Sequence, residues 1–129
     1  MSKTISAKKE FNVLIIDDNE QITKMISTFL SLNNHKCTIA NHAQDGLELL
    51  IKNEYDAILL DLTMPDMDGY DILDKIKESD IRFNVIVLTA SNISVENMKK
   101  IKQIGTKTIL QKPVDIDVLL EKISQIANS

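Results

Sequence analysis

Polar side chains stand at the ends of four apolar stretches of this chain. Asp61 ends the run DAILLD, and the pair Asp17-Asp18 ends FNVLIIDD. Thr89 comes at the end of the run NVIVLT, and Lys112 directly follows KTILQ. A carboxylate beside other carboxylates, a hydroxyl and an ammonium group can bind a cation and accept a phosphoryl group. That chemistry requires a fold that brings the four run ends together.

The three aspartates favour Mg²⁺ as a cofactor. Carboxylates that met at one place would repel one another, and a divalent cation would remove that cost. Oxygen ligands that are few in number and leave room for water suit Mg²⁺ better than Zn²⁺ or an enclosing Ca²⁺ cage. His35 and His42 are isolated and Cys37 stands alone, so no cluster of His and Cys competes for a metal.

Composition limits the class of protein. The chain has 129 residues, of which 43% are hydrophobic and 26% charged, as in a one-domain globular protein. A net charge of -4 gives no electrostatic reason to expect nucleic acid as a partner. A single cysteine favours a reducing compartment, and no apolar run approaches the length of a membrane span. We therefore expect a cytoplasmic protein without a membrane or nucleic-acid partner.

The sequence predicts a short tail followed by one domain. Residues 1–10 are basic and lack the apolar core of a signal peptide, so they predict a flexible N-terminal tail. Residues 11–129 contain no linker, repeat or low-complexity segment. They predict one domain.

Short β-branched runs alternate with amphipathic segments along that domain. The runs predict strands at 11–17, 36–40, 56–61, 84–90 and 107–111. Apolar residues three and four positions apart predict helices at 19–32, 43–53, 68–79, 94–105 and 114–127. In the first two helices this spacing places Met25 with Ile26, and Ile51 with Leu50, on the apolar face that should be buried. This alternation predicts an α/β fold, a doubly wound five-stranded parallel sheet with helices on both faces. The flavodoxin-like strand order 2-1-3-4-5 suits five strands.

This topology gives the acidic residues a common location. Ligands of such sheets bind beyond the carboxyl ends of the strands, at the point where the strand order reverses, between the first and third strands. Asp17-Asp18 and Asp61 end those two strands, so we expect the three carboxylates to converge there. Asp18 could also cap the helix that follows it, because Asp is a favoured N-cap residue.

Taken together, the motifs resemble the receiver domains of two-component response regulators. The matching residues are Asp17-Asp18 after VLII, Asp61 in LLDLTMPDMDG, Thr89 in VLTA and Lys112-Pro113 in LQKP. The resemblance covers nearly the whole chain from about Phe11, which makes 11–129 the receiver domain. Each motif alone is weak, but all four at ordered strand ends are highly specific.

The resemblance implies a phosphorylation-dependent signalling switch. Asp61 would accept a phosphoryl group from a sensor histidine kinase or a histidine phosphotransfer protein. The ligands of Mg²⁺ would be Asp17, Asp18, Asp61 and the backbone carbonyl of Thr63. Thr89 and Lys112 would bind the phosphoryl oxygens. The chain would catalyse only its own phosphorylation and dephosphorylation, so we do not expect an enzyme with separate substrates.

The resemblance also implies an output surface, and at one position of that surface this chain departs from the family pattern. The change at Asp61 would reach a partner protein through the face formed by the fourth helix, the fifth strand and the fifth helix, and we expect a monomer. Typical receivers carry Tyr or Phe three residues before the lysine, whereas this chain has Ile109. We therefore expect Ile109 to stay packed, with signalling carried more by loop and fourth-helix displacement.

Other functions remain open on the sequence. The chain could be a phosphorelay intermediate that passes its phosphate to a second histidine, or a chemotaxis-type messenger. It could also be a receiver cut from a longer protein. A pseudo-receiver that acts as a constitutive binding module is a further alternative, although it predicts a degraded acidic pocket and all the pocket side chains are present. A phosphatase of the haloacid dehalogenase type fits poorly, because it would need an acid where this chain has Thr63. A flavin-binding flavodoxin also fits poorly, because the acidic DDNEQ after the first strand would repel the flavin phosphate.

Overall fold

A computed structural model describes residues 10–62, 69–78, 84–90, 93–104 and 108–127 of the chain. In this part of the chain the strands are β1 (Asn12–Ile16), β2 (Lys36–Ala40), β3 (Ala57–Asp61), β4 (Val85–Thr89) and β5 (Thr108–Gln111). The helices are α2 (Glu20–Leu32), α3 (Ala43–Lys52), α4 (Gly69–Glu78), α5 (Val95–Ile104) and α6 (Ile116–Ala127). Every predicted element is present, and no end differs from its predicted position by more than two residues. Residues 1–9 of the predicted tail lie outside the described residues.

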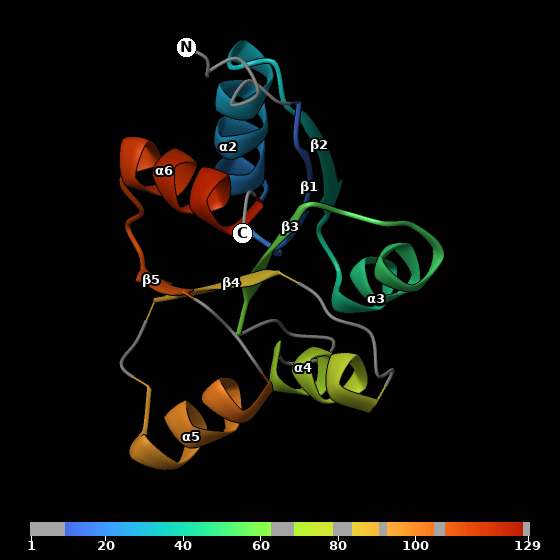
Figure 1. The fold of residues 1–129 in the computed structure, drawn as a ribbon, viewed down its shortest axis with the longest axis vertical. Helices are drawn as coiled ribbons and strands as arrows, with labels where there is room; N and C mark the ends of the chain where they lie inside the picture. The colour runs from blue at the N-terminus through green and yellow to red at the C-terminus, as the bar shows by residue number, and fades with distance from the viewer. Residues whose placement is uncertain (1–9, 63–68, 79–83, 91–92, 105–107, 128–129) are drawn as a thin grey trace, which may run out of the picture.

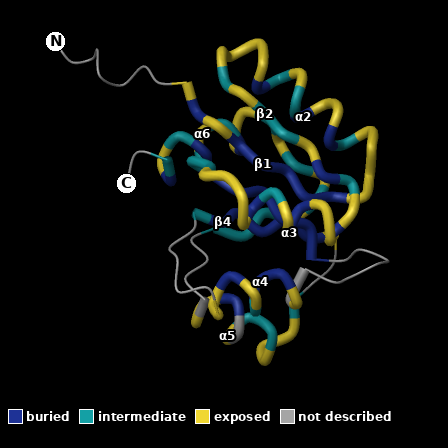
Figure 2. The backbone as a smooth tube through the Cα atoms, turned by 90° about the vertical axis from the view of Figure 1, so that its right-hand side faces the viewer, coloured by how far each residue is buried: buried dark blue, intermediate teal, exposed yellow. Residues whose placement is uncertain are grey.

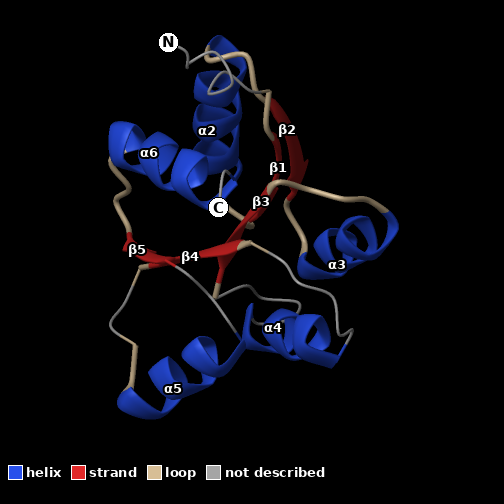
Figure 3. Ribbon diagram, in the orientation of Figure 1, coloured by secondary structure: helices blue, strands red, loops and turns tan. Residues whose placement is uncertain are grey.

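The strands form one parallel sheet in the order β2-β1-β3-β4-β5 within the described ranges. Helices α2 and α6 cover one face of this sheet, and α3, α4 and α5 cover the other, as Figures 1 and 3 show. The predicted α/β class and strand order are confirmed. Among the described helices, none is long and apolar enough to cross a membrane.

Alternate side chains of the central strands divide between two cores. Leu14 and Leu60 belong to the core beneath α3, α4 and α5, whereas Val13 and Leu59 belong to the core beneath α2 and α6. Figure 2 shows the buried strands between helices whose outer sides are exposed. Because both faces of β1, β3 and β4 are covered, these strands are apolar almost throughout, as expected for a parallel sheet.

Two predicted inward-facing residues point outward instead. The apolar spacing placed Met25 with Ile26 on the buried face of α2, and Ile51 with Leu50 on that of α3. Met25 is 48% exposed and Ile51 is 69% exposed, whereas Ile26 and Leu50 are buried. Successive helix residues are turned by about 100°, so a residue next to the centre of the buried stripe can lie outside it.

Gly46 marks the closest approach between α3 and the sheet. A Cβ atom at this position would lie 2.7 Å from Ile16 Cγ1 and 2.8 Å from both Ile16 Cδ1 and Cγ2. Ile16 is fully buried in β1, so it has little space to move away. The glycine lets the helix backbone rest directly on the strand that leads to Asp17.

Candidate functional site

The strand ends bring four polar side chains to one edge of the sheet. Asp61 is the last residue of β3 and Thr89 the last residue of β4, while Asp17 and Lys112 directly follow β1 and β5. These strands stay paired up to their carboxyl ends. The backbone N–H of Lys112 donates to the carbonyl of Thr89 at 2.7 Å, which continues the pairing beyond β5. The carboxyl ends of these four strands therefore lie side by side at one edge of the sheet.

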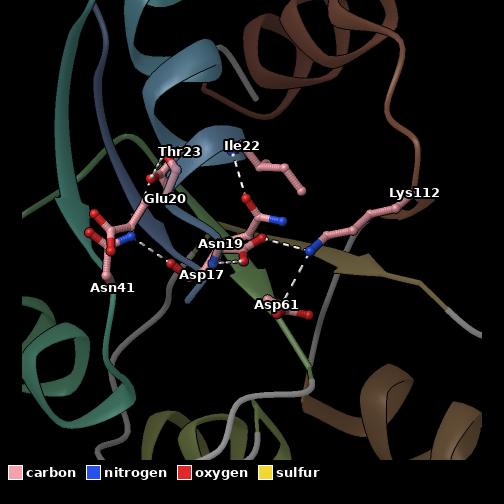
Figure 4. Close-up of polar contacts among 8 residues, drawn as sticks. All are labelled: Asp17, Asn19, Glu20, Ile22, Thr23, Asn41, Asp61 and Lys112. Atoms are coloured by element: carbon pink, nitrogen blue, oxygen red, sulfur yellow. Dashed lines mark hydrogen bonds and ion pairs between the residues drawn. The ribbon is translucent and has the colours of Figure 1, made fainter.

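Lys112 reaches across this edge toward two carboxylates. Its Nζ lies 2.8 Å from Asp17 Oδ2 and 3.7 Å from Asp61 Oδ2 (Figure 4). The side chain of Asp17 is fully buried, that of Asp61 is 6% exposed and that of Lys112 is 15% exposed. A buried carboxylate is costly unless it is paired, so Lys112 compensates charge that the fold removes from water.

Asp17 is held by contacts on its backbone and its side chain. Its N–H donates to the carbonyl of Ala40 at 3.0 Å, and its Oδ1 accepts the N–H of Asn19 at 2.9 Å. Oδ2 is buried and accepts no well-aligned hydrogen bond among the described residues, so its close contact with Lys112 is an ion pair alone. One oxygen of Asp17 is thus directed into the site with capacity for a further cation.

The carboxylates of Asp17, Asp18 and Asp61 form a compact acidic group. Each offers an oxygen, and these oxygens lie within 4.8 Å of one another. Asp18 is exposed, so the group opens to solvent on one side. Three carboxylates and one ammonium group give the site a net negative charge, which a divalent cation would neutralise.

Most of the chain matches one family by sequence. A profile described as "Response regulator receiver domain" matches residues 13–124, which include all four strand ends of the site. This chain belongs to the response regulator receiver family.

Proteins of several kinds contain a segment similar to this chain. The sensor histidine kinase RcsC of Salmonella typhimurium is 30% identical over 97% of this chain, and the chain spans only 13% of that protein. The chemotaxis protein CheY of Treponema pallidum is 31% identical over 90% of this chain and 82% of its own length. The receiver domain of the Francisella response regulator 1452 is 31% identical, with a TM-score of 0.84 over 92% of this chain and 98% of that one.

The acidic pocket of this receiver fits Mg²⁺. Its donors are carboxylate oxygens, which Mg²⁺ prefers, and the buried Oδ2 of Asp17 has no aligned hydrogen-bond donor among the described residues. Receiver domains in general bind Mg²⁺ at such a pocket, in agreement with the cofactor that the sequence predicts. Thr63, whose carbonyl completes the predicted ligand set, lies outside the described residues.

The interpretation of Asp18 as a helix cap is wrong. The N-cap of α2 is Asn19, whose Oδ1 accepts the N–H of Ile22 at 3.0 Å (Figure 4). Asn and Asp are equally good N-cap residues. The helix α2 begins one residue later than a cap at Asp18 would require. Asp18 is thereby left to the acidic group. An Asn immediately before a strongly amphipathic segment was the available sequence signal.

Thr89 and Ile109 occupy the positions predicted for them. Thr89 is buried at the end of β4, beside the acidic edge. Ile109 is half-buried in β5, paired with Val87, and packs against the core beneath α3, α4 and α5. The structure therefore places an aliphatic side chain where the resemblance leads one to expect an aromatic ring.

The remaining chemically active side chains lie apart from the acidic group. His35 stacks on Phe11, with ring centroids 4.8 Å apart, and its Nδ1 accepts the N–H of Phe11 at 3.1 Å. His42 is the N-cap residue of α3, and Cys37 is half-buried in β2. None of these three residues belongs to the group of possible metal ligands found in the described part of the chain.

Proposed function

We propose that Asp61 accepts a phosphoryl group in a Mg²⁺-dependent reaction, and that the chain acts as a phosphorylation-controlled signalling switch. The observation that carries this proposal is the meeting of Asp61 with two further carboxylates and an ammonium group at one sheet edge. Such a site combines a nucleophile, a place for Mg²⁺ and a cation for developing negative charge.

Asp61 is the best placed of the three carboxylates to act as nucleophile. Asp17 is fully buried and engages both oxygens, one with the N–H of Asn19 and one with Lys112. Asp18 is exposed to solvent. Asp61 ends the central strand, and its oxygen lies 3.7 Å from Lys112 Nζ, which leaves room for rearrangement when a phosphoryl group arrives.

The other residues divide the remaining work. Bound Mg²⁺ would neutralise charge on the phosphoryl oxygens, and Asp17 and Asp18 would hold it. An oxygen of Asp61 forms a bond to phosphorus while the bond from phosphorus to the donor breaks, and the leaving group keeps that electron pair. The Lys112 ammonium and the Thr89 hydroxyl then donate hydrogen bonds to the oxygens of the transferred group.

The proposal extends to the partners of the chain and to the surface that transmits its signal. The phosphoryl donor is a sensor histidine kinase or a histidine phosphotransfer protein. The structural change that follows phosphorylation reaches a target protein through the face formed by α5, β5 and α6. Ile109 stays packed during this change, and displacement of α5 and the neighbouring loop carries the signal. The chain does not turn over separate substrates, and it acts in the cytoplasm as a monomer.

A role as a phosphorelay intermediate is the second candidate. One observation favours it: a similar receiver segment forms part of RcsC, a protein described as a sensor histidine kinase. A receiver in that context can pass its phosphate to a second histidine instead of to an output partner. Transfer of label from the phosphorylated chain to a histidine phosphotransfer protein would distinguish this role from that of a terminal switch.

Intact-mass spectrometry with acetyl phosphate and Mg²⁺ tests the proposal. We expect one phosphoryl adduct that requires Mg²⁺ and that disappears in Asp61→Asn. Asp56→Asn is the matched control, because Asp56 directly precedes the other end of β3 and accepts the N–H of Asn12 at 2.7 Å. An adduct that persists in Asp61→Asn would contradict the choice of nucleophile, and no adduct in the unmodified chain would favour the constitutive binding module.

A further inference from the structure

Asn41 joins three elements behind the acidic group. It directly follows β2, and its Nδ2 donates to the backbone carbonyl of Asp17 at 2.9 Å and to Thr23 Oγ1 at 3.2 Å. Figure 4 shows the Asn41 side chain pointing from the end of β2 toward both partners. One amide thus connects the end of β1, the end of β2 and the first turns of α2.

Both partners of this amide are themselves fixed. The N–H of Asp17 donates to the carbonyl of Ala40, so both backbone groups of Asp17 are bound by consecutive residues at the end of β2. Thr23 is 2% exposed, and its hydroxyl donates to the carbonyl of Glu20 at 3.1 Å. Asn41 therefore links the loop at residues 17–19 to a buried residue in the first turn of α2.

The loop at residues 17–19 needs support from outside itself. Asn19 binds Asp17 Oδ1 and caps α2, but both contacts lie within the loop and the helix that follows it. Asp18 is exposed, so the packing of neighbours does little to orient its carboxylate. The direction of that carboxylate depends on the backbone of Asp17, which Asn41 holds from a different strand.

We propose that Asn41 is a positioning residue for the Mg²⁺ site. Its amide fixes the backbone of Asp17, and thereby the directions of the Asp17 and Asp18 carboxylates, without touching the metal or the phosphoryl group. Groups that orient metal ligands in this way commonly change metal affinity by about tenfold or more. The inference rests on the proposed function, because it assumes that this acidic group binds Mg²⁺.

Isothermal titration of the full chain with Mg²⁺ alone, without a phosphodonor, measures the effect directly. We expect Asn41→Ala to raise the Mg²⁺ Kd by about tenfold. The Mg²⁺ concentration for half-maximal phosphorylation by acetyl phosphate should rise by the same factor. The phosphorylation rate at saturating Mg²⁺ should change by less than about twofold, because the bound cation would itself hold the Asp17 and Asp18 carboxylates in place.

Asn84→Ala is the matched control. Asn84 Nδ2 donates to the backbone carbonyl of Asp56 at 3.1 Å, which is the same kind of bond at the opposite edge of the sheet. Both variants should lower the thermal midpoint to a similar extent, but Asn84→Ala should leave the Mg²⁺ Kd unchanged. If both variants lose stability and neither changes the Kd, Asn41 is a structural residue only and the proposal is wrong.

Further outcomes separate this inference from the proposed function. An unmodified chain that binds Mg²⁺ but takes no phosphoryl group would contradict the proposed function, and the Kd of Asn41→Ala would still decide the role of Asn41. An unmodified chain that binds no Mg²⁺ would overturn the inference. If Asn41→Ala does not fold, Asn41→Ser takes its place, with the same expected rise in Kd and the same contradicting result.

Discussion

Lys112 and Asp17 form the central charge pair at the scale of single residues. The ammonium group lies 2.8 Å from a carboxylate that is fully removed from water, and 3.7 Å from the carboxylate of Asp61. In the absence of a metal, this lysine supplies positive charge to the acidic group. A bound cation would share that task, so the lysine and the metal should partly replace each other.

Lys112→Ala should separate stability from chemistry. Without Mg²⁺, we expect the free energy of unfolding to fall by about 3 kcal/mol, because Asp17 would keep a buried charge without its partner. Mg²⁺ should restore part of that loss, while phosphorylation of Asp61 should slow by at least about tenfold. Urea unfolding with Mg²⁺ and with a chelator, together with intact-mass kinetics, measures both effects. Lys102→Ala, on the exposed side of α5, is the control, and a loss that Mg²⁺ does not change would contradict this account.

Cys37 should be a poorly reactive thiol. Burial raises its pKa from 9.0 to about 11, against a smaller lowering by the hydrogen bond with Ser27. At pH 8 its thiolate fraction should be about 100-fold below that of an ordinary cysteine, so alkylation should be slower by a similar factor. Iodoacetamide labelling followed by mass spectrometry tests this, and unfolding in urea should abolish the protection.

The same pKa has a consequence for stability. The folded thiol keeps its proton between pH 9 and about 11, where the unfolded thiol has lost it. The folded state then binds more protons than the unfolded state, so the free energy of unfolding should fall as the pH rises through this range. A loss that is equally steep in Cys37→Ser would show that other groups are responsible.

At the scale of elements, the distance between α3 and β1 is set by Gly46. The helix backbone approaches Ile16 so closely that a Cβ atom would meet three of its side-chain carbons at 2.7 to 2.8 Å. Glycine normally weakens a helix by about 1 kcal/mol relative to alanine. Here close packing against the strand explains why the weaker helix former is present.

Gly46→Ala should therefore destabilise the fold even though it improves helix propensity. We expect the free energy of unfolding to fall by about 1 to 2 kcal/mol, because the cost of overpacking exceeds the gain in propensity. Ile16→Val removes one of the crowded carbons and should recover about 1 kcal/mol in the double variant. Ile15→Val, which faces the opposite core, is the matched control and should be additive with Gly46→Ala.

The whole molecule assembles one site from four strands that are far apart in sequence. Asp17 and Asp61 are 44 positions apart, and Lys112 lies still further along the chain. In the folded chain, an oxygen of each aspartate lies within salt-bridge distance of the Lys112 Nζ. The acidic group exists only when the sheet is formed. A cation that binds this group should therefore stabilise the folded state over the unfolded state.

Mg²⁺ should raise the thermal midpoint of the unphosphorylated chain. At a concentration tenfold above its Kd, the gain should be about 1.4 kcal/mol, which corresponds to a rise in Tm of about 5 °C. Differential scanning calorimetry with NaCl at matched ionic strength measures it. Asp18→Asn should lose most of the rise, whereas Asp45→Asn, on the exposed side of α3, should keep it. An equal rise in both variants would point to a general salt effect.

The elements, their order and the identity of the strand-end residues could all be predicted from local sequence patterns. Apolar runs of strand length and amphipathic segments of helix length are local patterns, so the fold class and strand order were predicted correctly. The positions of Asp17, Asp61, Thr89 and Lys112 follow from that order, because the carboxyl ends of parallel strands share one edge. Local periodicity did not predict the exposure of Met25 and Ile51, which lie beside the buried stripes of their helices.

The contacts among the strand-end residues depend instead on tertiary packing. The ion pair between Lys112 and Asp17, the amide of Asn41 on the Asp17 carbonyl and the close contact of Gly46 with Ile16 all join different elements. Such contacts depend on strand register and helix position to within about an ångström, and no spacing in one segment encodes them. The sequence identifies which groups meet at the edge, and packing determines the direction in which each one points.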